Sequence, residues 1–122
     1  MMFEENRIEY LKPYCNGIYD ILVKCAGAPD SEDCRDMFNY QFGKMILNGR
    51  GEYRFQGKLG FGGKIYFSGY DFQIGYYSED HTKQRLAIVR ETTNKLDEFL
   101  LENPINEAIF AAKNAKDEET SY

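Results

Sequence analysis

Three cysteines and a single histidine are the side chains in this sequence with the widest chemical potential. Cys15, Cys25, Cys34 and His81 together carry the thiolate and imidazole groups of a Cys3His zinc site. Such sites use closely spaced ligand pairs, whereas successive cysteines here lie ten and nine residues apart. Buried, reduced cysteines that pack as small hydrophobes fit the pattern better. The sequence therefore predicts no metal and no cofactor.

Catalysis finds little support in the same residues. A cysteine nucleophile would need His81 beside it as a base, and the sequence spacing does not favour that contact. Acidic neighbours such as Asp97 and Glu98 do not face each other on a helix, so they form no acid–base pair. We predict no catalytic residue. A small enzyme whose site assembles from distant segments remains the third hypothesis.

A glycine cluster at residues 60–63 raises the question of a phosphate-binding loop. The nucleotide-loop motif requires a glycine five positions before Gly63 and a hydroxyl after Lys64. The chain has Lys58 and Ile65 at those two places. We therefore interpret the cluster as a hairpin turn that needs positive φ angles.

Residues 52–77 contain nine of the nineteen aromatic side chains. Apolar and polar residues alternate there with a period of two, which predicts an antiparallel sheet with one aromatic face. We expect strands near 52–59, 64–69, 70–77 and 83–90. Residues 83–90 could instead belong to the following helix, and the segments 64–69 and 70–77 could form one long strand bent at Ser68-Gly69.

Helices are predicted on both sides of this sheet. An apolar stripe from Ile8 to Cys25 indicates a first helix, in which Pro13 either produces a kink or begins a second helix. A further helix follows a cap at Asp30 or Ser31 and ends at Asn48-Gly49. Two C-terminal helices are expected, the first after a cap at Thr92 or Thr93 and the second after a break at Asn103-Pro104.

The expected fold is α+β: a four-stranded antiparallel β-meander covered by two N-terminal and two C-terminal helices. Residues 1–116 form one domain, and residues 117–122 form a flexible polar tail. The longest apolar run is Ala108–Ala112, far shorter than the roughly 20 residues of a membrane span. An odd cysteine count favours a reducing compartment. We therefore expect a cytoplasmic protein with no membrane contact.

Charge is distributed unevenly along the chain. Fifteen basic and twenty acidic side chains give a net charge of −5. Residues 50–90 carry seven basic and four acidic groups, hence +3, whereas residues 91–122 carry three basic and eight acidic groups, hence −5. Opposite charges that neutralise each other within the fold are the ordinary explanation. The alternative is that the acidic and the basic segments each form a binding surface.

Two candidate surfaces follow from this distribution. Acidic side chains near the C-terminal helices would attract a protein with a basic surface; they are Asp97, Glu98, Glu102 and Glu107. Basic and aromatic side chains of the predicted sheet could instead follow phosphates and stack on bases of a single-stranded nucleic acid. This second set comprises Arg54, Lys58, Lys64, Tyr66 and Arg85.

We expect a non-enzymatic, acidic protein-binding module, an inhibitor that occupies a basic site on its target. In general composition the chain resembles phage-encoded anti-defence proteins, such as anti-CRISPR proteins, and toxin-immunity proteins. This resemblance of compact, acidic, tyrosine-rich domains is carried by no motif. Single-stranded nucleic-acid binding through the sheet is the alternative function. A homo-oligomer is compatible with either function.

Overall fold

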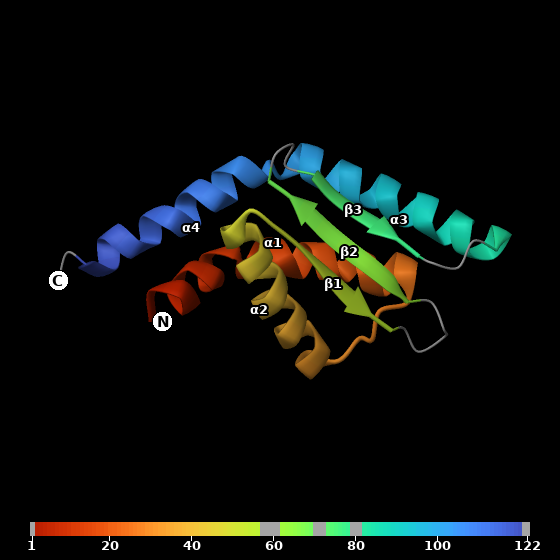
Figure 1. The fold of residues 1–122 in the computed structure, drawn as a ribbon, viewed down its shortest axis with the longest axis horizontal. Helices are drawn as coiled ribbons and strands as arrows, with labels where there is room; N and C mark the ends of the chain where they lie inside the picture. The colour runs from red at the N-terminus through yellow and green to blue at the C-terminus, as the bar shows by residue number, and fades with distance from the viewer. Residues whose placement is uncertain (1, 57–61, 70–72, 79–81, 121–122) are drawn as a thin grey trace.

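The computed structural model of the chain describes residues 2–56, 62–69, 73–78 and 82–120, with side chains for those between 7 and 114. Within these residues the fold is α+β, with four helices and one antiparallel sheet of three strands in the order β1-β2-β3 (Figure 1). The α+β class is confirmed, but the predicted fourth strand is wrong. The elements are α1 (Met2–Ala26), α2 (Glu32–Asn48), β1 (Arg50–Phe55), β2 (Gly63–Ser68), β3 (Gln73–Tyr77), α3 (Lys83–Glu102) and α4 (Ile105–Thr120).

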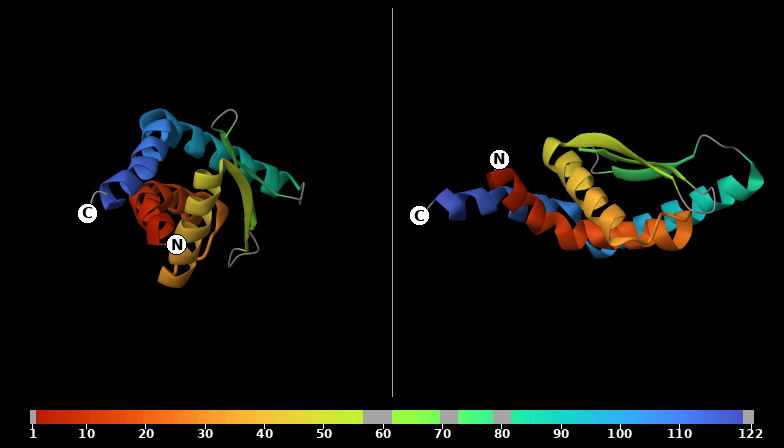
Figure 2. Two further views of the ribbon diagram at one scale, coloured as in Figure 1. Left: turned by 60° about the vertical axis from the view of Figure 1, so that its left-hand side comes forward. Right: turned by 90° about the horizontal axis from the view of Figure 1, so that it is seen from below.

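The helices all lie on one side of the sheet, which forms an outer layer (Figure 2). Helix α2 packs against β1, and α3 packs against β3. Helix α1 lies between the other helices and contacts α2, α3 and α4. The core therefore sits between α1, α2, α3 and the inner face of the sheet.

Strand register places the alternating side chains as the sequence predicts. Tyr53 pairs with Ile65, and Ile65 pairs with Tyr76, so these three residues share one face across all three strands. That inner face is formed by six apolar or aromatic side chains: Tyr53, Phe55, Ile65, Phe67, Ile74 and Tyr76. Tyr53 is half-buried and the other five are buried. Strands β2 and β3 are separate paired strands, so the alternative of one bent strand at Ser68-Gly69 is wrong.

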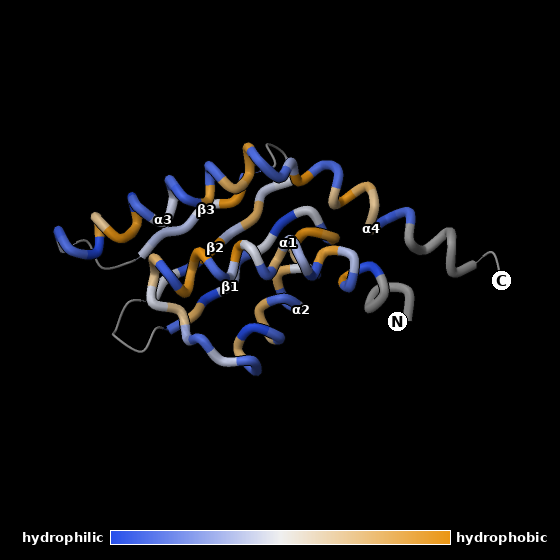
Figure 3. The backbone as a smooth tube through the Cα atoms, turned by 180° about the vertical axis from the view of Figure 1, so that it is seen from behind, coloured by the Kyte–Doolittle hydropathy of each residue, from blue (hydrophilic) through white to orange (hydrophobic). Residues whose placement is uncertain are grey.

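The predicted strand at 83–90 is instead the first half of helix α3. Thr82 caps this helix, because its side-chain oxygen accepts a hydrogen bond from the Arg85 backbone N–H at 3.4 Å. Capping at Thr92 or Thr93 is therefore wrong, and Thr92 is fully buried in mid-helix. Half-buried Ile88 and Val89 pack against the core. In Figure 3, hydrophilic and hydrophobic stretches repeat within the turns of α3, which is the pattern of a helix with one buried side.

Helix α1 is continuous through Pro13, which settles the choice between one helix and two. Pro13 is exposed, and a proline inside a helix costs about 3 kcal/mol. Buried Leu11 and Cys15 lie on either side of it, so core packing on both sides holds the helix together. One turn later, Gly17 allows close packing, because a Cβ there would lie 2.5 Å from Cε2 of Phe99 on α3.

Both ends of helix α2 confirm local predictions. Ser31 is the N-cap, and its side chain accepts a hydrogen bond from the Cys34 backbone N–H at 3.1 Å. Gly49 ends the helix in the left-handed conformation, with φ of 84°. The predicted break at Asn103-Pro104 is also confirmed, since Asn103 is the C-cap of α3 and α4 begins at Ile105.

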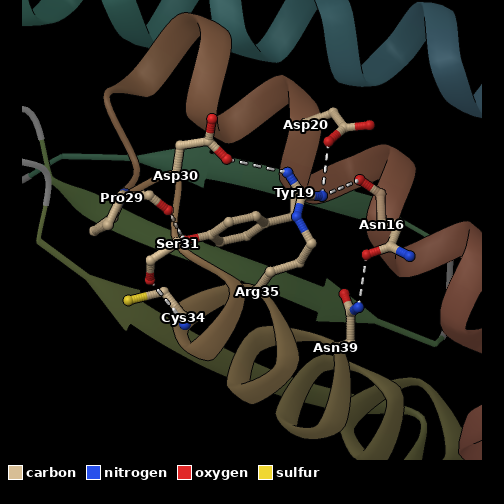
Figure 4. A network of polar contacts seen from close by, with 9 residues as sticks. All are labelled: Asn16, Tyr19, Asp20, Pro29, Asp30, Ser31, Cys34, Arg35 and Asn39. Carbon is tan, nitrogen blue, oxygen red and sulfur yellow. Dashed lines mark hydrogen bonds and ion pairs between the residues drawn. The ribbon is translucent and has the colours of Figure 1, made fainter.

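Arg35 joins α2 to α1 and to the loop between them (Figure 4). Its guanidinium lies 2.7 Å from an Asp20 carboxylate oxygen and donates to the Asn16 backbone carbonyl at 3.4 Å. It also lies 5.2 Å from the ring centre of Tyr19, whose hydroxyl donates to the Pro29 carbonyl at 2.7 Å. Arg35 is therefore a structural residue that fixes the angle between the first two helices.

We expect Arg35→Ala to lower the free energy of unfolding by about 1–2 kcal/mol, because it removes a charged hydrogen bond and a cation–π contact. The ion pair contributes little of this, since the Asp20 side chain is 65% exposed. Urea denaturation monitored by circular dichroism measures the change. Arg90→Ala, at an exposed position on α3, is the matched control and should change stability by less than about 0.5 kcal/mol. Equal midpoints for the two variants would contradict this role for Arg35.

Candidate binding surfaces

The predicted acidic residues all lie at the surface, where α3 meets α4. Asp97, Glu98 and Glu102 are exposed on the last turns of α3, and Glu107 is exposed in the first turn of α4. Residues 96–112, which contain these four carboxylates, include no Lys or Arg. Lys95 borders the group and lies 3.5 Å from a Glu98 carboxylate oxygen. We call these four residues the acidic surface.

Two apolar side chains stand out from the same segment. Leu101 is 83% exposed and Phe110 is 70% exposed, the highest values among the large hydrophobic residues described. Leu101 follows Asp97 by four positions and Glu98 by three, and Phe110 follows Glu107 by three. Residues with these spacings are neighbours on a helix. Each exposed apolar group therefore has a carboxylate beside it.

Both apolar side chains point away from the protein. Helices α3 and α4 each pack on α1, with Leu96 and Phe99 of α3 and Ile105 and Ala112 of α4 turned toward the core. At 100° per residue, Leu101 and Phe110 each lie about 140° around the helix from Leu96 and Ile105, respectively. Sequence reasoning identified the carboxylates but not these two, since exposed leucine and phenylalanine are visible only once the buried side of each helix is known.

The second candidate surface is the outer face of the sheet, on the side opposite the helices. Register groups its residues into three rows across the strands. The first row is Arg54, Lys64 and Tyr77; the second is Glu52, Tyr66 and Gly75; the third is Arg50, Ser68 and Gln73. We call these nine residues the outer sheet face. Helix α2 packs on the opposite side, as shown by the contact between the Phe38 ring and the inner-face ring of Tyr53.

Tyrosine rings make up the centre of the outer sheet face. A Cβ at Gly75 would lie 2.2 Å from Cζ of Tyr66, so the Tyr66 ring lies directly over this glycine. The rings of Tyr66 and Tyr77 are 6.1 Å apart. Nζ of Lys64 lies 5.5 Å from the Tyr77 ring centre, and the Tyr77 hydroxyl donates to Glu52 at 3.1 Å. The result is a pair of rings with cations close by.

The predicted nucleic-acid residues divide between two places. Arg54, Lys64 and Tyr66 come together on the outer sheet face, whereas Lys58 lies outside the described residues. Arg85 belongs to α3, where its charge acts on Tyr76 of the inner face, so it does not join the group. Tyr77 and Arg50 also belong to this surface, although the predicted nucleic-acid set did not include them. The strand register that aligns them with Lys64 and Ser68 is not visible in the sequence.

The cysteines occupy separate positions in the fold. Cys15 is fully buried, and Cys25 and Cys34 are partly buried. In the part of the chain that the structure describes, no three His, Cys, Asp or Glu side chains gather to hold a metal ion. His81, the fourth residue of the zinc hypothesis, lies outside the described residues. The zinc hypothesis thus gains no geometric support from the described cysteines.

The chain matches none of the protein-family models, curated proteins or solved structures compared with it. Over the described residues, no helix combines the length and the apolar character needed to cross a membrane. The two surfaces are therefore interpreted from their own geometry.

We expect the protein to lose stability at alkaline pH. Burial raises the pKa of the Cys15 thiol from 9.0 to about 12. Burial is also the largest cause that raises the pKa of Tyr19 from 10.0 to about 12. Above about pH 9 the unfolded chain releases protons that the folded chain retains, so stability falls as pH rises from 9 toward 12. Urea midpoints between pH 8 and 11 measure this.

Cys15→Ala is the variant that separates the thiol from the tyrosine. It removes one of the two groups, so its midpoint should fall less between pH 8 and 11 than that of the wild type, whatever its stability at pH 8. Cys25→Ala removes a partly buried thiol and should keep most of the wild-type pH dependence. A Cys15→Ala curve parallel to the wild-type curve would show that the Cys15 thiol makes no contribution.

Proposed function

We propose that the protein is a non-enzymatic binding module whose acidic surface occupies a basic site on another protein and so inhibits it. One observation carries this proposal. Of the described residues, the most exposed large apolar side chains are Leu101 and Phe110, and residues 96–112, which contain both, have four exposed carboxylates and no lysine or arginine. Exposed apolar side chains that each have a carboxylate beside them form a surface that a basic partner can complement.

Each part of this surface has a different physical task. Burying the Leu101 and Phe110 side chains against a partner would contribute about 1.5–3 kcal/mol each. Interface energy is usually concentrated in a few such buried anchors. The carboxylates accelerate association with a basic partner and disfavour acidic ones. Affinity therefore depends mainly on the apolar pair, and partner choice on the acidic groups.

Inhibition follows from the kind of partner that such a surface selects. Basic protein surfaces commonly bind polyanions through lysine and arginine. A folded domain that presents carboxylates and two apolar anchors would cover such a surface and exclude its natural ligand. Anti-defence proteins, such as anti-CRISPR proteins, and toxin-immunity proteins are the inhibitor classes that the chain resembles in general composition. We place the protein with such inhibitors by this mechanism of action.

Charge reversal at the acidic surface should abolish capture of the partner. Asp97→Lys, Glu98→Lys and Glu102→Lys together change the net charge from −5 to +1, since each reversal adds two. The matched control reverses Glu9, Asp33 and Asp36, which are exposed on α1 and α2, and gives the same net charge. Affinity capture from a cell lysate with wild type, reversal and control, analysed by mass spectrometry, identifies proteins lost only with the reversal.

The apolar anchors give an independent test with the purified partner. Phe110→Ala and Leu101→Ala should each weaken binding by roughly 10-fold or more, because a buried anchor contributes at least about 1.4 kcal/mol. Met37 on α2, a large apolar side chain that is 60% exposed, supplies the control Met37→Ala. A partner captured equally by the reversal and by its control, or one insensitive to Phe110→Ala, would show that the acidic surface is not the interface.

A further inference from the structure

We propose that the outer sheet face binds single-stranded nucleic acid, with Tyr66 and Tyr77 as stacking platforms and Arg54 and Lys64 on the phosphates. This site is independent of the acidic surface, from which it differs in location, charge and chemistry. No described helix or strand covers the outer sheet face (Figures 1 and 2).

The outer sheet face is basic within an acidic protein. Among its nine residues three are basic (Arg50, Arg54 and Lys64) and one is acidic (Glu52), so the formal charges of these nine side chains sum to +2. Because the whole chain carries −5, the remainder carries −7. A local excess of positive charge on a chain of opposite net charge restricts polyanion contact to this face. The charge thus selects a phosphate-bearing ligand.

Ring geometry narrows the ligand to one with exposed bases. Tyr66 lies over Gly75, where the absence of a Cβ leaves room for the ring against the strand. One side of the ring thus rests on the sheet, and the Tyr66 side chain as a whole is half-exposed, which suits a stacking platform. Tyr77 is the second ring, 6.1 Å away and inclined at 54°. Two inclined rings suit two successive bases of a flexible single strand better than the stacked bases of a duplex.

Cations lie on both sides of this ring pair. Arg54 and Lys64 are register partners in the row that contains Tyr77, and Arg50 lies two rows away. Adjacent rows are about 7 Å apart along the strands. A strand crossing the rows would therefore pass Arg50 at one end and the Arg54–Lys64 pair at the other, with its bases on the tyrosines.

A matched control for this site exists elsewhere in the protein. On α2, Nζ of Lys44 lies 5.2 Å from the ring centre of Tyr40, which is 42% exposed. This pair has the same chemistry as Lys64 and Tyr77, whose separation is 5.5 Å, but it stands alone on a helix. Substitutions at Tyr40 and Lys44 therefore control for the loss of a tyrosine or a lysine as such.

Fluorescence anisotropy with a labelled twelve-nucleotide strand, as RNA and as DNA, tests the proposal. Wild type should bind single strands with a dissociation constant of roughly 1–100 µM near physiological salt. Tyr66→Leu and Tyr77→Leu should each weaken binding roughly 5- to 150-fold, whereas Tyr40→Leu should not. Lys64→Ala should reduce the slope of log affinity against log salt by about 0.7, and Lys44→Ala should leave it unchanged.

Gly75→Ala tests the platform without removing any ligand-contacting group. Its methyl group must displace the Tyr66 ring, so a folded Gly75→Ala protein should bind single strands more weakly than wild type. If this variant does not fold, the surface substitution Tyr77→Leu decides the question alone.

Three results would overturn the proposal: no binding by wild type at low salt, equal losses in the Tyr77 and Tyr40 variants, or a duplex bound as tightly as a single strand. If Tyr77→Leu kept its affinity for the single strand but no longer captured a protein from the lysate, the outer sheet face would be a protein-binding surface instead. Charge reversal at Asp97, Glu98 and Glu102 leaves these residues untouched, so failure here and failure of the proposed inhibitor function are distinguishable.

Discussion

One constraint organises this fold: an apolar, aromatic sheet face must be removed from water. Six side chains from three short strands form that face, and a three-stranded sheet is too small to bury them on its own. Helices α2 and α3 therefore pack against its two edge strands, and α1 fills the space behind them. All four helices lie on this side, so no described element covers the opposite side of the sheet. Burial of one face thus leaves the other available for a ligand.

Close approach of the helices depends on particular small residues. Gly17 allows the Phe99 ring of α3 to lie directly against α1, and that ring also packs on Tyr14 with centres 5.2 Å apart. On the other side of α1, Arg35 fixes α2 through one guanidinium that reaches Asp20 and Asn16. The central helix thus packs through apolar side chains on both sides, including the Tyr19–Phe38 ring contact with α2, and Arg35 adds polar contacts on the α2 side only.

The fold places the basic and the acidic segments of the chain on different surfaces. The basic middle segment places Arg50, Arg54 and Lys64 together on the outer sheet face, and the acidic C-terminal segment places its carboxylates at the α3–α4 corner. Two surfaces of opposite charge on separate elements are suited to different ligands. A protein that covers a basic nucleic-acid-handling partner while contacting its strand would use both, which unites the two proposals without making either depend on the other.

The sequence alone determined the features governed by local rules. Period-two alternation predicted the aromatic sheet face, the Ser31 cap and Gly49 predicted both ends of α2, and Asn103-Pro104 predicted the break between α3 and α4. Only the tertiary structure decided that residues 83–90 are helical, that α1 continues through Pro13, and that Tyr77 joins Arg54, Lys64 and Tyr66. Caps, stops and alternation act within a few residues of sequence. Strand register and helix burial depend on contacts between distant segments, and they override local preference for strand or against proline.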